Sequence, residues 1–399
     1  MVLAIPLSES VKNIAFGLAL AGGLAFCCLR RGRGLRLYPV GWGQLGLVVA
    51  ALISLPFALS PLQGLRGAWD LFRAFAVFAL MANLLRSDRA VRWCVWAFLV
   101  GISVGAVWGI SHFAWGYWEA KETGLIGVRH AVEIHSLGHP NHTATYLLMM
   151  LALALGVVVH GRSDPHLWRL GLGAAPLIAV ALAFTYSRSA LITALVVVAT
   201  FGVFWWRKGG RARAWVVGSI IVCLILFVAA GARKTRSADL AHILKAPFTK
   251  GAMSDRFIVW GGVIRIMRTR PLVGVGPRNF NFMDKYRYGI QSSFHYFNHA
   301  HSMYFNVLAE MGLLGLGALF AWLFCYARAC FGLLLGGSGQ SLGRGLAVGA
   351  TAALAVLMIS GLVTTTLHTE GAMAISGLLG MALAERNYQG RTSRDSREQ

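Results

Sequence analysis

Long apolar runs alternate with short polar segments along most of the chain. A run of about 20 apolar residues is long enough to cross the hydrocarbon core of a bilayer as a helix. The pattern therefore predicts an all-α, polytopic membrane protein. Residues 1–8 are apolar but too short to span, so they form a half-helix or the remnant of a twelfth helix, and the predicted count is eleven or twelve. The eleven predicted spans lie near residues 10–29, 41–60, 67–85, 91–115, 143–160, 168–184, 189–206, 214–231, 311–333, 345–364 and 370–384.

Composition agrees with this interpretation, since 57% of the 399 residues are hydrophobic and only 13% are charged. Soluble domains carry about 25% charged residues. The net charge of +22 does not indicate a nucleic-acid partner, because the basic residues lie between apolar runs rather than along one soluble face. All six cysteines lie within apolar runs, which favours packed side chains over a disulfide framework or a metal cluster. The first long run is followed by an arginine-rich segment, so we expect no cleaved signal peptide.

Charge in the short loops predicts the orientation of the chain. Cytoplasmic loops of membrane proteins collect Lys and Arg. The basic segments, assigned to the cytoplasm, are 30–36, 86–92, 160–169, 207–213 and the tail at 386–399. The segments that alternate with them, assigned to the outer side, are 61–66, 116–142, 185–188 and 365–369. The predicted organisation is N-terminal transmembrane helices at 1–231, a large outward loop with amphipathic helices at 232–301, C-terminal transmembrane helices at 302–385 and the cytoplasmic tail.

The outward loop at 232–301 is strongly basic, with 12 Lys or Arg residues against 3 Asp residues. Two explanations stay open, an anionic substrate bound by arginine forks and contact with anionic lipid head groups. Within the loop, a helix from Asp255 to about Arg268 is predicted, ended by Pro271. On it Arg256 is one turn from Trp260, and Arg265 lies over Arg268.

Two histidine-rich segments, at 135–142 and at 295–301, flank predicted spans on the outer side. His135, His139, Asn141 and His142 lie where the span near 143–160 begins, and their spacing favours polar groups lining a sugar or head-group site over zinc.

His301 stands where the chain enters the membrane again, with Ser302 as the predicted helix N-cap. Glu310 follows about 13 Å deeper, at 1.5 Å per residue, and needs a partner or a hydrated pocket. From these residues alone, His301 is either a catalytic group or a satisfied interfacial histidine.

Two intramembrane features complete the set of candidate residues. Asp70 and Arg73 are three residues apart in one span and are predicted to pair. Arg188 begins a span on the outer side, so it shares a membrane leaflet with Arg256 and His301.

These segments, taken in order, resemble the O-antigen ligase and polymerase superfamily of bacterial inner-membrane glycosyltransferases. The similarity rests on GHPNHTA (138–144), SRSA (187–190), DRFIVW (255–260), RPLVGVGPRNF (270–280) and HSMYFNVLAEMGLLG (301–315). The last of these fits the family signature through His301, Ser302, Gly312 and Gly315, although Ser302 stands where many relatives have Asn. The predicted count also falls short of the family's twelve helices unless residues 1–8 belong to the first one.

The resemblance implies a GT-C-like glycosyltransferase in the bacterial inner membrane with a periplasmic active site. Such an enzyme moves a glycan from undecaprenyl diphosphate to an acceptor, which for a ligase is lipid A-core; membrane lipids are its other partners. Polymerases and protein O-oligosaccharyltransferases share much of the pattern. The compact chain favours the ligase. A transporter or flippase is a distant alternative, because no internal repeat is visible.

The resemblance also implies a mechanism without a cofactor. His301 is the expected base, and Arg188 and Arg256 are expected to neutralise the leaving diphosphate. No Asp-x-Asp cluster faces outward, so no metal is expected. The role of His299 in the chemistry stays open, as does that of His295. The expected substrate-binding residues are Arg265, Arg268, Trp260, Asn141, His142, His299 and Arg278.

Overall fold

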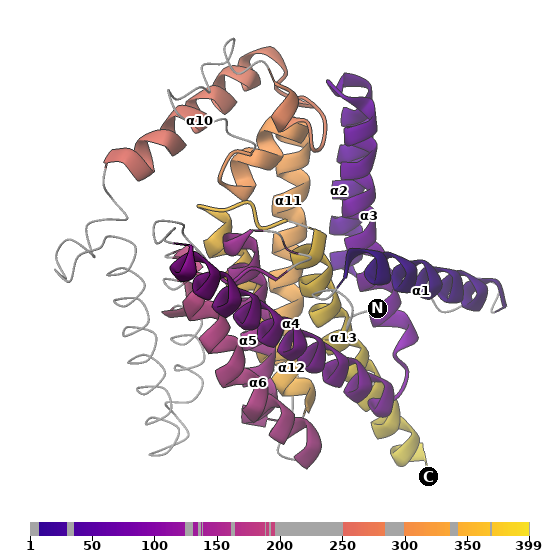
Figure 1. Cartoon of the computed structure of the whole chain (residues 1–399). Coiled ribbons are helices and arrows are strands. Elements are labelled where there is room, and N and C mark those ends of the chain that lie inside the picture. Colours follow the sequence, from indigo (N-terminus) through magenta and orange to yellow (C-terminus); the bar gives the residue numbers. More distant parts are fainter. Residues whose placement is uncertain are drawn as a thin grey trace.

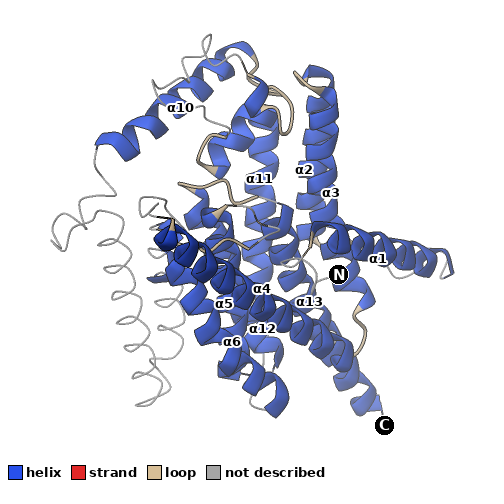
Figure 2. Cartoon of the chain, viewed as in Figure 1, coloured by secondary structure: helices blue, strands red, loops and turns tan. Residues whose placement is uncertain are grey.

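The computed structural model describes residues 8–29, 36–123, 131–134, 137, 139–160, 164–187, 189–190, 193–195, 250–283, 299–335, 342–367 and 369–398. Within these ranges the regular structure is entirely helical (Figure 2). The helices are α1 (Glu9–Leu29), α2 (Pro39–Ser54), η2 (Leu55–Phe57), α3 (Pro61–Leu84), α4 (Asp88–Glu122), α5 (Pro140–His160), α6 (Pro165–Phe184), α10 (Lys250–Thr269), η5 (Phe280–Phe282), α11 (Met303–Leu335), α12 (Leu342–Gly361) and α13 (Thr369–Glu398).

Nine of the predicted spans correspond to helices of the structure, while those at 189–206 and 214–231 fall largely outside the described residues. Seven helices in the described ranges are long and apolar enough to cross a membrane. They are α2 extended through η2, α3, α4, α5, α6, α11 and α12. The prediction of an all-α polytopic membrane protein is therefore confirmed, and the count of eleven or twelve spans stays a prediction.

Helix α5 forms the centre of the bundle, and most of its side chains are buried. It packs against α12 at a point where two glycine backbones meet. A Cβ atom on Gly156 would lie 2.3 Å from the carbonyl oxygen of Gly345, so a side chain here would push the helices apart. Small residues at such crossings let transmembrane helices approach closely, which is how packing replaces the hydrophobic effect inside lipid.

The last helix is longer than the sequence analysis predicted. The span was expected at 370–384, followed by a separate tail, but α13 continues without interruption from Thr369 to Glu398. Its first half is buried in the bundle. The tail is rich in Arg, Glu and Gln, which are good helix formers. At residue 386, where the tail was expected to begin, the sequence becomes polar but the helix continues.

Helix α1 runs crosswise to α2 and α3 rather than parallel to them (Figure 1). A buried ion pair holds it to the bundle, because Lys12, which is fully buried, pairs with Glu370 at the start of α13. Lys12 also pairs with Glu9 of its own helix at 2.7 Å.

Candidate functional site

Helix α10 lies over the end of the bundle where α11 begins (Figure 1). It starts at Lys250, slightly earlier than predicted, and ends at Thr269 just before Pro271, as predicted. Its buried face contributes to a small hydrophobic cluster that also contains residues of the following loop and of α11. The buried members of this cluster are Val259, Val263, Ile266, Val275, Phe280, Met283, Ala300 and Ala309. The cluster joins the loop, α10 and α11 into one packed unit.

The loop after α10 is inserted into a break in α11. The break is at Gly312, whose φ of 61° and ψ of −158° are not helical. In a continuous helix, the carbonyl groups of Ala309 and Glu310 would accept from the N–H groups of residues 313 and 314. In this protein all four groups bond to the loop instead. The bonds are Val275 N–H to Ala309 O (3.0 Å), Gly276 N–H to Glu310 O (2.8 Å), Leu313 N–H to Pro271 O (2.9 Å) and Leu314 N–H to Leu272 O (3.2 Å).

Glycine is required on both sides of this junction. A Cβ atom on Gly312 would lie 2.3 Å from the carbonyl carbon of Leu272. A Cβ atom on Gly274, which has φ 64°, would lie 2.4 Å from the carbonyl oxygen of Ala309. The segments 270–280 and 301–315 noted in the sequence analysis thus form the two halves of one junction.

The Glu310 carboxylate beside this junction has partners in the loop, as its depth in the span required. It accepts hydrogen bonds from the backbone N–H groups of Arg278 and Phe280 and from the side chain of Asn306. Asn306 Oδ1 accepts in turn from the N–H of Ala300 at 3.2 Å. A continuous set of hydrogen bonds therefore leads from the loop to the residue that precedes His301.

His301 occupies a strained turn at the mouth of α11. Its φ of 50° is rare for a residue with a side chain. Ser302 directly precedes the helix, as predicted. Its hydroxyl, however, donates to the carbonyl of Gly361 at 3.2 Å and so ties the turn to the end of α12. The turn is thereby held from three sides, by α10, α11 and α12.

Trp260 of α10 supplies the contact from the loop side. Its ring stacks on Phe305 with centroids 4.9 Å apart and planes at 9°. Its Nε1–H donates to the carbonyl of Ala300 at 3.0 Å. Arg256, one turn earlier on α10, is near enough for its charge to act on His301. Trp260 thus positions the His301 turn, and Arg256 contributes to the electrostatic environment of His301.

The two histidine-rich segments come together at this turn, although they are far apart in the sequence. Ring centroids are 5.3 Å apart for His139 and His142, 6.3 Å for His142 and His299, and 4.4 Å for His299 and His301. His139 Nδ1 accepts from the N–H of Asn141 at 3.1 Å, which fixes the start of α5. His135 lies outside the described residues. Over the part of the chain that the structure describes, no group of His, Cys, Asp or Glu is arranged to hold a metal ion.

The charge state of His301 follows from this setting. The pKa of the imidazole is lowered from 6.5 to about 4, first by burial and then by the positive charges of His299, Arg256 and His139. Both effects disfavour the imidazolium form. At neutral pH the ring is therefore unprotonated and able to accept a proton.

The remaining predicted residues lie elsewhere. Arg265 and Arg268 are on the exposed side of α10. Arg265 is nine positions after Arg256, which at about 100° per residue puts it on the opposite face of the helix. Arg188 is outside the described residues, between Ser187 and Ser189, whose hydroxyls are 3.2 Å apart.

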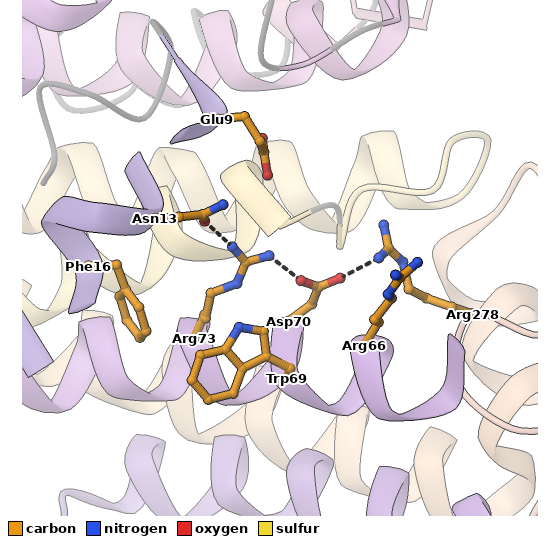
Figure 3. A pocket seen from close by; sticks show the side chains of 8 residues that line it. All are labelled: Glu9, Asn13, Phe16, Arg66, Trp69, Asp70, Arg73 and Arg278. Carbon is orange, nitrogen blue, oxygen red and sulfur yellow. Dashed lines mark hydrogen bonds and ion pairs between the residues drawn. The ribbon is translucent and has the colours of Figure 1, made fainter. Parts of the chain in front are cut away.

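Arg278 follows the junction and contacts α3 rather than the histidines. Its Nη1 is 3.3 Å from Asp70 Oδ2 (Figure 3). The predicted pair of Asp70 and Arg73 is confirmed. The sequence analysis missed the second arginine on Asp70, and it also missed Asn306 and Phe305. Phe305 and Asn306 lie within about one turn of His301 in the same sequence motif, and this proximity could have identified them as residues of the site.

Comparison with known proteins identifies a similarity in the part of the chain that contains the His301 turn. Residues 173–320 match the family model described as O-antigen ligase. No curated protein matches the chain at a significant level. The matched stretch contains α10, the inserted loop, His301 and the break at Gly312. The chain is therefore similar to the O-antigen ligase family over residues 173–320, which supports membership of the O-antigen ligase and polymerase superfamily.

Proposed function

We propose that this protein is an O-antigen ligase that transfers a glycan from undecaprenyl diphosphate to lipid A-core at the periplasmic face of the bacterial inner membrane. The family match supports transfer of the O-antigen ligase or polymerase type. The observation that carries the proposal is His301, a histidine held in a strained turn, unprotonated at neutral pH and within reach of the Arg256 charge.

The reaction is an inverting displacement at the anomeric carbon of the donor. An acceptor hydroxyl oxygen forms the new bond to that carbon as the bond to the phosphate oxygen breaks. His301 accepts the hydroxyl proton, and the diphosphate leaves with the bonding electrons. A base whose protonated form is disfavoured before the substrates bind stays available for this proton at neutral pH.

Arginine side chains neutralise the charge that develops on the leaving diphosphate. Arg256 is the first candidate, because its charge already acts on His301. Arg188 is the second, on the strength of its place in the sequence motif. A planar guanidinium makes two parallel hydrogen bonds to phosphate oxygens, so no metal ion has to be part of the step.

The other predicted residues take supporting roles in this proposal. His142, His299 and Asn141 line the donor side of the turn, and Trp260 holds the turn in place. Arg265 and Arg268 are on the exposed face of α10, where they meet the donor's lipid-proximal phosphate or anionic head groups.

The test replaces His301 by Ala and by Gln in a bacterium that lacks its own ligase. Lipopolysaccharide is separated on a gel beside that of the same strain carrying the wild-type protein. We expect the wild type to restore the high-molecular-weight ladder and both variants to lose it at normal protein levels. The matched control is His166→Ala, an exposed histidine at the start of α6 that should retain the ladder.

Two outcomes contradict the proposal. A full ladder from His301→Gln would exclude the base role, because an amide cannot accept the proton. If the wild type itself restores nothing while polymeric glycan accumulates on its lipid carrier, the acceptor is not lipid A-core. The polymerase and the protein-directed transferase, which share the base and the clamp, would then replace the ligase.

A further inference from the structure

A charged pocket lies beside α1, α3 and the inserted loop, and His301 is not among the residues that line it. It has a volume of about 210 Å³. The side chains that give it its character are Asn13, Arg66, Trp69, Asp70, Arg73 and Arg278 (Figure 3). The mechanism above uses none of these residues.

The pocket carries an excess of positive charge. Its three arginines face two carboxylates, those of Asp70 and Glu9. Asp70 pairs with Arg73 and with Arg278, and Glu9 pairs with Lys12. Arg66 is exposed. One anionic group with a single charge would balance the lining.

Arg73 has unused hydrogen-bonding capacity in this pocket. The residue is 8% exposed, and its Nη1 donates to Asn13 Oδ1 at 2.8 Å. Its Nε is buried and meets no acceptor among the residues of the described ranges. A buried guanidinium of this kind is a strong donor group that the fold itself satisfies only in part.

The backbone fixes the position of Arg278 over Asp70. The loop crosses α3 at Gly67, where a Cβ atom would lie 2.7 Å from Cβ of Pro277. Arg278 has φ 55°. Asn279, which is fully buried, accepts from the N–H of Ser60 at 2.6 Å. This strained and tightly bonded placement holds one arginine fork at the pocket.

A smaller cavity adjoins this pocket on the side of α11. Its volume is about 140 Å³, and it shares Asp70 and Arg278 with the first pocket. It extends to Met303 and Asn306 of α11, within five residues of His301. The Asp70–Arg278 ion pair therefore lines both the charged pocket and the cavity that reaches the start of α11.

We propose that the charged pocket binds an anionic sugar of the acceptor, one that carries a phosphate or a carboxylate group. The arginine forks take the anion. Asp70 and Asn13 accept from sugar hydroxyls, and the Trp69 ring, 47% exposed, packs on the C–H face of the sugar. This inference rests on the proposed function, which assigns the donor diphosphate to Arg256 and leaves the acceptor without a site.

The first experiment measures binding without catalysis. The full-length protein in nanodiscs of uncharged phosphatidylcholine is titrated with glucose 6-phosphate, with glucose and with inorganic phosphate, and the shift in Tm is followed. We expect glucose 6-phosphate to raise Tm more than either comparator does. Arg66→Gln should weaken this effect at least tenfold in apparent Kd, and Trp69→Leu should also weaken it. Arg89→Gln, an exposed arginine on α4, is the matched control and should bind as the wild type does.

Three binding results would overturn the proposal. Equal stabilisation by inorganic phosphate would identify a free-phosphate site. Loss of the sugar-phosphate effect in nanodiscs that contain phosphatidylglycerol would identify a lipid head-group site. An unchanged Kd in Arg66→Gln would exclude the pocket altogether.

The second experiment measures glycan transfer with purified donor and acceptor. Arg66→Gln should raise KM for the acceptor by about tenfold and leave KM for the donor unchanged, whereas a rise in KM for the donor would contradict the assignment. If the wild type shows no transfer to lipid A-core but Arg66→Gln still abolishes sugar-phosphate binding, the proposed function fails and the binding site stands.

Discussion

At the scale of single residues, the proposed function depends on the placement of one imidazole. His301 is half-buried and close to other groups that carry or acquire positive charge. A protonated ring is therefore unfavourable before substrate binds. Burial and these neighbouring charges keep His301 in its basic form.

The pH dependence of the reaction should report this directly. In the proposed mechanism the base is neutral His301, so activity should be lost as the pH falls through the pKa of about 4 rather than through 6.5. We expect the acid limb of kcat/KM to lie near pH 4 in the wild-type protein. Arg256→Gln removes one positive charge, so the pKa of His301 rises and the limb moves to higher pH.

The matched comparison is Arg268→Gln on the exposed side of α10, which should leave the limb in place. Initial rates of glycan transfer between pH 4 and pH 8 provide the measurement. A wild-type limb near 6.5 would show that His301 is not held as the structure indicates.

Trp260 is expected to act as a positioning residue. Trp260→Phe keeps the ring stacked on Phe305 but removes the Nε1–H bond to Ala300, which is worth about 1 kcal/mol, or roughly fivefold in rate. Trp260→Leu also removes the stacking, so its kcat should fall further, by about 50-fold in total.

Saturating kcat measurements would test this order of effects. Trp108→Phe, an exposed tryptophan on α4, should leave kcat unchanged. A Trp260→Leu variant with wild-type kcat would remove Trp260 from the positioning of the turn.

At the scale of elements, the junction between the inserted loop and α11 is the central feature. Four backbone hydrogen bonds replace two that a continuous helix would make. No backbone group at the break loses its partner, so the helix is interrupted inside the bundle without the cost of unpaired groups. The interruption lets one segment orient both Glu310 and Arg278.

Gly312→Ala should disrupt this junction. The new Cβ would clash with the Leu272 backbone, and alanine would be forced into a conformation that glycine alone tolerates. We expect Tm to fall by roughly 5 °C or more. Gly317→Ala in the same helix is the control, because its Cβ would meet nothing within 4 Å, and its Tm should be unchanged or slightly higher.

Thermal unfolding in detergent would separate the two variants. An equal fall in Tm for both would mean that α11 is sensitive to any added methyl group, and the junction would lose its special role.

At the scale of the whole molecule, α1 is attached to the bundle through buried charge. Lys12 pairs with Glu370 across a separation of 358 residues in the sequence. A buried pair contributes little net stability, but removing one partner leaves a charge buried without compensation and costs about 3–5 kcal/mol.

We therefore expect Lys12→Met to lower Tm clearly. Glu370→Gln should lower it less, because Lys12 keeps its pair with Glu9. The double variant should recover most of the loss, because no buried charge is then left in that pair. Asp88→Asn, which breaks a partly exposed pair with Arg92, should change Tm only slightly. Additive losses in the double variant would contradict the coupling.

Much of the fold could be predicted from the sequence because a transmembrane span is a local property. Apolar run length located α2, α5 and α12 to within a few residues. The end of α10 at Pro271 was likewise predictable, since proline acts on its own neighbours. The extension of α13 through the tail was not, because polar sequence is compatible with both a helix and a loop.

For the candidate site, too, some features could be predicted from the sequence and others could not. The sequence by itself determined the membrane-embedded class of the protein and the residue types near each helix mouth, including His301, because these depend on side chains a few positions apart. Only the tertiary structure decided that the histidines of two distant segments meet and that the loop fills the break at Gly312. The tertiary structure also decided that Arg278 pairs with Asp70 of α3. Those contacts join backbone and side-chain groups far apart along the chain, and their partners are selected by three-dimensional packing rather than by any local pattern.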